Sequence, residues 1–323
     1  MSARIDAALA EGLTLDGPVL AMRPDGAFDP EGLGAVTALS TFRPDHDRLA
    51  RRMPVVTEAE GRFAAAIVFA QRSRALTEAM IHDACRLLPP GAPVWLDGAK
   101  TDGVEAILRA LRRWAEVDAV LSKAHGKLVA FRAAPPPAGW AAAPRDVEGF
   151  RTVPGVFSEG KVDAGSRALA AALPPLEGAV ADLGAGWGWL SAQALRSEAV
   201  TRLDLVEAEG LALDCARRNV ADPRAAFHWA DATAWTGPEA RGHDAVVTNP
   251  PFHAGRTGEP ALGQAFLAAA ARLLAPSGRL FAVANRHLPY EATLRDLFAE
   301  VVVHPGGGGY KVLESRRPKG RRR

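Results

Sequence analysis

The second half of the chain alternates short apolar runs with segments of helical periodicity. Apolar runs typical of buried strands occur at Val180–Leu183, Leu203–Val206, Ala225–Trp229, Ala245–Thr248 and Leu280–Ala284. Helical spacing of apolar residues separates several of these runs, at Leu190–Leu195, Leu211–Asn219 and Leu262–Leu274. This alternation predicts an α/β fold with a largely parallel sheet, in which ligands bind beyond the carboxyl ends of the strands.

The first half repeats part of this pattern 186 positions earlier. Residues 86–96 (RLLPPGAPVWL) resemble residues 272–282 (RLLAPSGRLFA), and each segment reads as a helix end, a turn and a buried strand. Further on, residues 126–129 (GKLV) resemble residues 309–312 (GYKV) as a closing strand. We interpret the similarity as a duplicated α/β domain.

A Pro/Ala-rich segment, AAPPPAGWAAAP at residues 133–144, has little apolar periodicity and lies between the two patterns. It predicts a first domain at residues 1–133, a linker at 134–149 and a second domain at 150–315. Residues 316–323 then form a basic tail.

Composition restricts the class of protein. Hydrophobic residues make up 48% of the chain and charged residues 24%, as in a globular protein with one or two cores. The two cysteines, Cys85 and Cys215, cannot form a disulfide framework and have no histidine neighbours for a zinc site. No apolar run approaches the roughly 20 residues of a membrane span, and the N-terminus is charged. We expect a cytoplasmic protein without metal or membrane contact.

The net charge of +2 depends on the C-terminus. Residues 316–323 hold six of the 39 basic residues, so the rest of the chain carries 33 basic residues against 37 acidic ones. A terminal cluster of this kind is typically disordered and suits contact with nucleic-acid phosphates. Compositional drift in an arginine-rich protein explains it equally simply.

Acidic residues and glycines mark the ends of the first three predicted strands in this half. Residues 182–188 (DLGAGWG) follow the first strand, Glu207 ends the second, and Asp231 with Ala232 follows the third. Glycines allow a tight turn close to a ligand, and carboxylates can accept from ribose hydroxyls or an adenine amino group. Each feature alone is also compatible with an ordinary turn or a solvated acid.

The fourth strand is followed by the more specific motif Asn249-Pro250-Pro251-Phe252. Proline at 250 keeps Asn249 out of helical dihedrals, and successive prolines stiffen the segment. The Asn249 side-chain oxygen and the Pro250 carbonyl can then accept both N–H bonds of an exocyclic amine and aim its lone pair at a methyl group. Phe252 offers a face on which a base can stack, whereas His253 could donate to the substrate but is more readily a surface residue.

These residues resemble those of a class I S-adenosylmethionine-dependent methyltransferase that methylates amines. The segments PGVFS at 154–158, VDAGS at 162–166, NPPFH at 249–253 and the pair Ala284-Asn285 are more narrowly similar to the RsmC/RlmG group of ribosomal RNA guanine-N2 methyltransferases. The resemblance implies two tandem Rossmann-like domains, the first degenerate and the second with a mostly parallel seven-stranded sheet. It also implies methylation of a guanosine N2, with 16S rRNA of the small subunit as the expected target.

The resemblance further implies which residues bind S-adenosylmethionine. Asp182, Gly184 and Gly186 would shape the methionine end of the pocket, Glu207 would hold the ribose, and Asp231 with Ala232 would read the adenine. Phe157 would pack over the cofactor, beside Asn249. Trp187 is bulky for a Gly-rich loop, and the Arg-rich tail is also unexpected.

The first half lacks these motifs. The 186-residue spacing places Asn249 against Phe63-Ala64, and alignment of the strand Ala65–Phe69 shifts it to Ala70–Arg72, so neither alignment gives Asn-Pro-Pro. We expect this domain to have lost both catalysis and cofactor binding. It would then bury a domain interface and help to dock RNA, or give structural support alone.

Other amine targets share the same chemistry. The alternatives are methylation of guanine N2 in 23S rRNA, of adenine N6 in tRNA or DNA, or of a protein glutamine. A non-catalytic rRNA-binding assembly factor is a further alternative.

Direct in-line transfer needs little acid–base catalysis, so the residues act mainly by positioning. The expected partner is ribosomal RNA or a ribosomal subunit, which must expose the base, and we expect a monomer.

Overall fold

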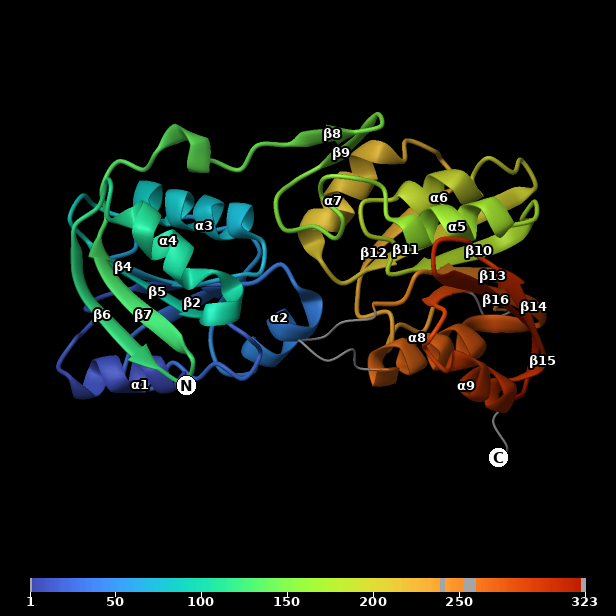
Figure 1. The fold of residues 1–323 in the computed structure, drawn as a ribbon, viewed down its shortest axis with the longest axis horizontal. Coiled ribbons are helices and arrows are strands. Elements are labelled where there is room, and N and C mark those ends of the chain that lie inside the picture. Colours follow the sequence, from blue (N-terminus) through green and yellow to red (C-terminus); the bar gives the residue numbers. More distant parts are fainter. Residues whose placement is uncertain (1, 239–241, 252–259, 321–323) are drawn as a thin grey trace. The chain divides into compact units, whose positions relative to one another are not determined.

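The computed structural model describes residues 2–238, 242–251 and 260–320. Phe252 and His253 of the Asn-Pro-Pro-Phe-His segment lie outside these residues. The chain divides into two compact units, the first formed by Met1–Pro144 with Val153–Gly155 and the second by Arg145–Thr152 with Val156–Arg323 (Figure 1).

The first unit contains one sheet, whose order in the described part of the chain is β3-β2-β1-β4-β5-β7-β6. Its strands are β1 (Val19–Met22), β2 (Val36–Leu39), β3 (Val55–Val56), β4 (Ala65–Phe69), β5 (Pro93–Ala99), β6 (Val117–Lys123) and β7 (Gly126–Arg132). Its helices are α1 (Ala3–Ala10), α2 (Arg43–Leu49), α3 (Arg74–Leu87) and α4 (Val104–Leu111), with short turns η1 (Lys100–Asp102) and η2 (Ala138–Trp140). Strand β7 runs antiparallel to both of its neighbours, and the other pairs are parallel.

The second unit contains a sheet of order β12-β11-β10-β13-β14-β16-β15, again within the described residues. Its strands are β10 (Gly178–Leu183), β11 (Val200–Glu207), β12 (Ala225–Trp229), β13 (His243–Thr248), β14 (Leu274–Asn285), β15 (Phe298–Pro305) and β16 (Tyr310–Pro318). Its helices are α5 (Ala164–Ala172), α6 (Trp189–Ala194), α7 (Gly210–Asn219), α8 (Pro260–Leu273) and α9 (Tyr290–Leu297). The hairpin of β8 (Arg145–Val147) and β9 (Phe150–Thr152) precedes them.

Helices cover both faces of this second sheet (Figure 1). Alternate strand residues point to opposite faces, so Val180 packs in one core with α5, α6 and α7, while Ala181 packs in the other with α8 and α9. Both cores consist of apolar side chains that are almost fully buried. Because the strands are buried on both faces, they are continuous apolar runs in the sequence. The expected α/β fold with a mostly parallel seven-stranded sheet is confirmed.

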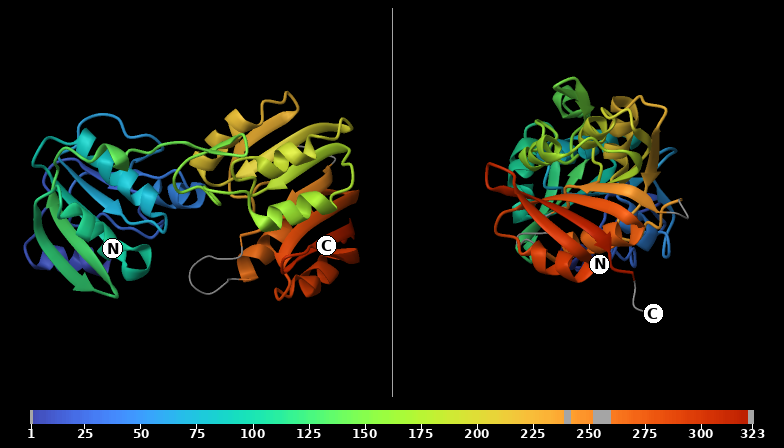
Figure 2. Two further views of the ribbon diagram at one scale, coloured as in Figure 1. Left: turned by 45° about the horizontal axis from the view of Figure 1, so that its top comes forward. Right: turned by 90° about the vertical axis from the view of Figure 1, so that its right-hand side faces the viewer.

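The two sheets have the same strand order, which confirms the predicted duplication. In the first, Val94 of β5 pairs with Ala66, and in the second Leu280 of β14 pairs with Val246. Val94 and Leu280 are the residues that the 186-position repeat matches. Figure 2 shows the long β6–β7 hairpin (green) at the edge of the first sheet and the twisted strands of the second sheet (yellow to red).

Two boundaries differ from those expected from the sequence. Trp140 of the Pro/Ala-rich segment packs edge-on against Trp114, at 5.3 Å between ring centroids, so this part of the segment belongs to the first unit. Strand β16 continues through Arg316 and Arg317 to Pro318, since Arg316 is paired with Arg279 of β14 in the sheet and its side chain bonds Glu314. The basic cluster therefore begins inside the last strand. Among the described residues, no helix is long and apolar enough to cross a membrane.

Candidate functional site

The carboxyl ends of three neighbouring strands bring the candidate residues together. Leu183 at the end of β10 is in register with Val206 of β11 on one side and with Thr248 of β13 on the other. Each of these residues is followed directly by a candidate, namely Gly184, Glu207 and Asn249. The Thr248 hydroxyl also donates to the Leu183 carbonyl (2.7 Å), which ties the ends of β10 and β13 together.

The Gly-rich turn opens onto a hollow. Gly184, Gly186 and Gly188 have φ values of 74°, 56° and 88°, a region that residues with a Cβ rarely adopt. A Cβ placed on Gly186 would meet no heavy atom within 4 Å, so the backbone there faces open space. A Cβ on Gly188 would come within 2.8 Å of Val220, so this third glycine serves the packing of the turn on α7.

The hollow contains about 420 Å³ of empty space and brings together Phe157, Gly184, Gly186 and Asn249. The Phe157 side chain is 62% exposed, which is unusual for a phenylalanine. The other described candidates are not part of its lining, namely Asp182, Glu207, Asp231, Ala232 and Pro250. Further lining residues are Ser158, Val162, Asp163, Ser166, Ala185, Trp187, Trp189 and Leu190.

Asp182 lies directly beneath the turn. It is 1% exposed, and its Oδ2 accepts from the Ser191 hydroxyl at 2.6 Å. Burial raises the pKa of Asp182 to about 7, and the negative charge of Glu207 acts in the same direction. Within the described residues, Asp182 Oδ1 is buried without a hydrogen-bond partner, so it can still accept a donor from a ligand.

Glu207 holds the turn in place. Its Oε2 accepts from the Gly186 amide (2.7 Å) and its Oε1 from the Glu209 amide (2.8 Å). Burial raises the pKa of this carboxyl above its usual value. A carboxylate oxygen can accept more than one hydrogen bond, so Glu207 can fix Gly186 and still accept from a hydroxyl group.

Asp231 caps its own turn. Its Oδ1 accepts from the Thr233 amide (2.8 Å) and from the Thr233 hydroxyl (2.6 Å). Ala232 is buried, at 3% exposure, in the core that α8 and α9 share with the sheet. These contacts make the Asp231 segment rigid without occupying the hollow.

Trp187, a bulky residue in the Gly-rich turn, is held by contacts with two other segments. Its indole is buried against Phe150 of β9, and its Nε1–H donates to the Phe157 carbonyl at 2.9 Å. Asn219 at the end of α7 donates to the carbonyls of Trp187 and Arg151, both at 2.8 Å. The bulky residue thus fastens the segment that carries Phe157 to the turn.

Asn249 is held in one orientation by two side chains. Its Nδ2 donates to Asp163 Oδ2 (2.8 Å) and to Ser166 Oγ (2.9 Å). Because a carboxylate accepts and does not donate, the amide nitrogen has to face Asp163. Asp163 also caps α5, where its Oδ2 accepts from the Ser166 amide at 2.9 Å.

The opposite side of the same amide is unused. Asn249 Oδ1 is buried and has no hydrogen-bond partner in the part of the chain that the structure describes. Leaving a buried acceptor unpaired costs about 1–3 kcal/mol, which a ligand that donates to it would recover. Pro250 is buried next to it. The site therefore offers a fixed oxygen acceptor beside a Gly-rich hollow.

Sequence reasoning did not identify Asp163 and Ser166 as functional residues. The Asp-x-x-Ser spacing at 163–166 is visible as a helix N-cap, but the bond to Asn249 joins residues 86 positions apart. Among the described residues, no cluster of His, Cys, Asp and Glu could hold a metal ion.

Comparisons with known proteins identify a family to which the chain is similar. The family described as "Methyltransferase small domain" matches residues 148–314. A protein of Hahella chejuensis named ribosomal RNA small subunit methyltransferase C is 32% identical over 243 residues, which are 69% of this chain and 68% of the relative. A protein of the same name from Pseudomonas aeruginosa is 30% identical over 88% of this chain and 87% of its own length.

A solved structure is similar over both units. It is the T. thermophilus 16S rRNA N2 G1207 methyltransferase (RsmC) in complex with AdoMet and guanosine. The TM-score is 0.78 at 26% sequence identity, and the match covers 98% of this chain and 92% of the other. The similarity therefore includes the tandem arrangement of two α/β units.

Proposed function

The chain belongs to the family of ribosomal RNA small subunit methyltransferases C, and we propose on this basis that it methylates the exocyclic N2 of a guanosine in 16S rRNA. It is an S-adenosylmethionine-dependent enzyme of the methyltransferase small domain family. The observation that carries the choice of an amine as acceptor is the unpaired, buried Oδ1 of Asn249.

The residues of the second unit fit S-adenosylmethionine. The open space in front of Gly186 leaves room for a ligand against the backbone, and Asp182 Oδ1 is a buried acceptor that lacks a donor. We propose that Asp182, Gly184 and Gly186 hold the methionine end, Glu207 the ribose, and Asp231 with Ala232 the adenine, with Phe157 above. When bound, the cofactor supplies an electrophilic methyl group.

The exocyclic amine of guanine has to be oriented by the enzyme before it can attack the methyl group. Its lone pair is delocalised into the ring, so the amine is a poor nucleophile until acceptors hold its N–H bonds. We propose that Asn249 Oδ1 and the Pro250 carbonyl accept these two bonds and thereby direct the lone pair towards the methyl group. Asp163 and Ser166 contribute by fixing Nδ2, because an amide that cannot rotate presents its oxygen in one direction. Phe252, for which we propose base stacking, lies outside the described residues.

The remaining assignments follow from this function. We propose that the second unit, which contains most of residues 150–315, carries catalysis and that the first unit is a degenerate domain without cofactor. Because rRNA is the substrate, we place the enzyme in the cytoplasm, where it would act as a monomer on rRNA or on a ribosomal subunit.

The direct test is methyl transfer by the purified protein to 16S rRNA and to 30S subunits from a strain that lacks the gene. Labelled S-adenosylmethionine is supplied, and the modified nucleosides are identified by mass spectrometry. We expect N2-methylguanosine from one position of 16S rRNA. 23S rRNA and tRNA from the same strain serve as matched substrates.

Two results would revise the proposal. N6-methyladenosine, or labelled 23S rRNA in place of 16S rRNA, would keep the amine chemistry and change the target. No binding of S-adenosylmethionine in calorimetry, with rRNA binding retained, would instead indicate an assembly factor without catalysis.

A further inference from the structure

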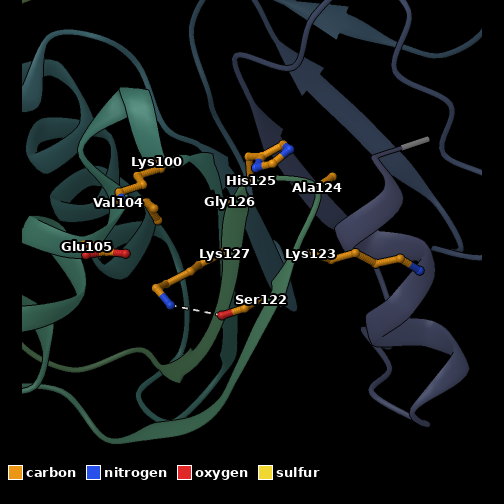
Figure 3. Close-up of a pocket in the computed structure, with 9 residues that line it drawn as sticks. All are labelled: Lys100, Val104, Glu105, Ser122, Lys123, Ala124, His125, Gly126 and Lys127. Atoms are coloured by element: carbon orange, nitrogen blue, oxygen red, sulfur yellow. Dashed lines mark hydrogen bonds between the residues drawn. The ribbon is translucent and has the colours of Figure 1, made fainter.

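A second hollow lies in the first unit, far in sequence from the candidate active site. It is formed between η1, the start of α4 and the tip of the β6–β7 hairpin (Figure 3). Lys100 and Glu105 lie on one side, and Ser122 and Lys127 lie on the hairpin side. His125 is at the tip.

The hollow concentrates lysine. The chain contains six lysines, and three of them, Lys100, Lys123 and Lys127, line this one site. Within the described residues, none of the three forms an ion pair. By contrast, Lys311 in the second unit is paired with Glu291 at 2.6 Å. Positive charge that no carboxylate neutralises is available to an anionic partner.

The backbone keeps the hollow in shape. The Lys100 amide donates to the His125 carbonyl (2.9 Å), and Arg4 donates to the Ala124 carbonyl (3.3 Å). A Cβ on Gly126 would lie 2.4 Å from the Gly98 carbonyl oxygen, so the hairpin approaches β5 as closely as the chain allows. These contacts therefore fix the backbone that carries the lysines.

The tip itself carries backbone strain. Ala124 and His125 have φ values of 47° and 53°, in the left-handed region where hairpin turns usually place glycine or asparagine. Residues held in such a conformation destabilise the folded chain locally and tend to occur at binding sites. The turn leaves the exposed imidazole of His125 at the rim.

The side chains have distinct orientations. Lys127 Nζ donates to Ser122 Oγ (3.0 Å), which leaves it further donors for a ligand. Figure 3 shows Lys123 extending away from Lys127, to the other side of the hairpin, so it extends the positive surface instead of lining its centre. Glu105 on the facing helix is the one acid in the lining and opposes anion binding.

We propose that Lys100 and Lys127, with His125 at the rim, bind a backbone phosphate of the RNA substrate. Lysine acts as a point charge towards phosphate, and such contacts position an RNA without reading its sequence. This inference rests on the proposed function for the identity of the RNA, and it gives the unit that lacks the cofactor motifs a specific part in substrate binding.

The test compares variants of the full-length protein in binding a 16S rRNA transcript, measured by fluorescence anisotropy over a salt series. For Lys100→Gln/Lys127→Gln we expect about five- to tenfold weaker binding at low salt and a salt dependence reduced by about 1–2 phosphate contacts. Arg51→Gln/Arg62→Gln removes the same charge from exposed positions of the same unit and is expected to have a smaller effect. In methyl transfer, the lysine variant should raise KM for rRNA and leave kcat unchanged.

Glu105→Gln provides a test of opposite sign. Removing the one carboxylate of the lining should tighten RNA binding about twofold to threefold. Lysine variants that bind like the arginine control, or a Glu105→Gln variant that binds more weakly, would overturn the proposal. Binding is measured without S-adenosylmethionine, so failure of methyl transfer in the wild-type protein would count against the proposed function and leave this result separate.

Discussion

The two units have the same sheet and differ at the ends of its strands. In the first unit, Met22 of β1 pairs with Leu39 and with Val68, in the same register in which Leu183 of the second unit pairs with its two neighbours. This register gives the equivalent residues directly. The equivalent pairs are Ala21 and Asp182, Arg23 and Gly184, Ser40 and Glu207, and Phe69 and Asn249.

Each replacement in the first unit removes a feature to which we assign a role in the second unit. Ala21 has no carboxylate, Arg23 adds a long side chain where the turn needs a glycine, and Phe69 packs edge-on against Phe28 at 5.2 Å. Alignment from sequence does not place Asn249 against Phe69. The 186-residue spacing points to Phe63-Ala64, and alignment of the strand Ala65–Phe69 points to Ala70–Arg72, which begins one residue beyond Phe69.

A hollow persists at this place in the first unit, with about 1000 Å³ of empty space. Two arginines of its lining have side-chain partners, since Arg4 forms an ion pair with Asp97, which also lines the hollow, and Arg23 donates to the Thr41 hydroxyl. The two units thus share buried apolar strands and differ in the residues at the strand ends, and we propose that these residues decide the chemistry.

The largest effect should follow from removing the amide acceptor of Asn249, which Phe69 replaces in the first unit. Asn249→Ala should reduce kcat about 100- to 1000-fold, as expected for loss of a group that fixes the reacting atoms. Methyl transfer to 16S rRNA under saturating substrate measures it. Phe69→Leu at the equivalent position is the matched control and should retain kcat. An Asn249→Ala enzyme with wild-type kcat would show that the two strand ends do not differ in the way proposed.

A pH effect should follow from Asp182, whose equivalent in the first unit is Ala21 and cannot ionise. The pKa of Asp182 is about 7 in the folded protein and near 3.8 when unfolded, so the folded state binds the proton more tightly. Stability from this group is present below about pH 4 and is lost as the pH rises to 7, by roughly 4 kcal/mol. Asp182→Asn cannot ionise and should avoid this loss, as measured by urea unfolding at several pH values. Parallel curves for wild type and variant would contradict the raised pKa.

The smallest effect should come from loosening Asn249 without removing it. Ser166→Ala leaves Asp163 as the one identified acceptor for Nδ2, and we expect kcat to fall about fivefold, the equivalent of one hydrogen bond. Because the group acts on orientation, KM for rRNA should stay constant. Ser197→Ala, which removes a hydroxyl bonded to the Leu176 carbonyl, is the control. A change in KM alone would indicate a binding role for Ser166.

Much of this architecture could be predicted from the sequence, because each signal was local. Buried parallel strands need continuous apolar runs, so the run at 245–248 marks most of β13, which is His243–Thr248 in the structure. The Gly-rich turn, the strand-end acids and the Asn-Pro-Pro segment are likewise short motifs whose conformational limits follow from their own residues. The repeat at 186 positions sufficed to predict two units of one fold.

Only the tertiary structure decided how those groups are held. The bonds from Asn249 to Asp163 and Ser166, the fastening of Phe157 by Trp187, and the continuation of β16 through Arg316 join residues distant in sequence. Hydrogen bonds and burial of this kind depend on where folding places each partner, and no local pattern records it. The sequence therefore determined which chemistry this protein carries, and the packing of distant segments determined which atoms are left free to perform it.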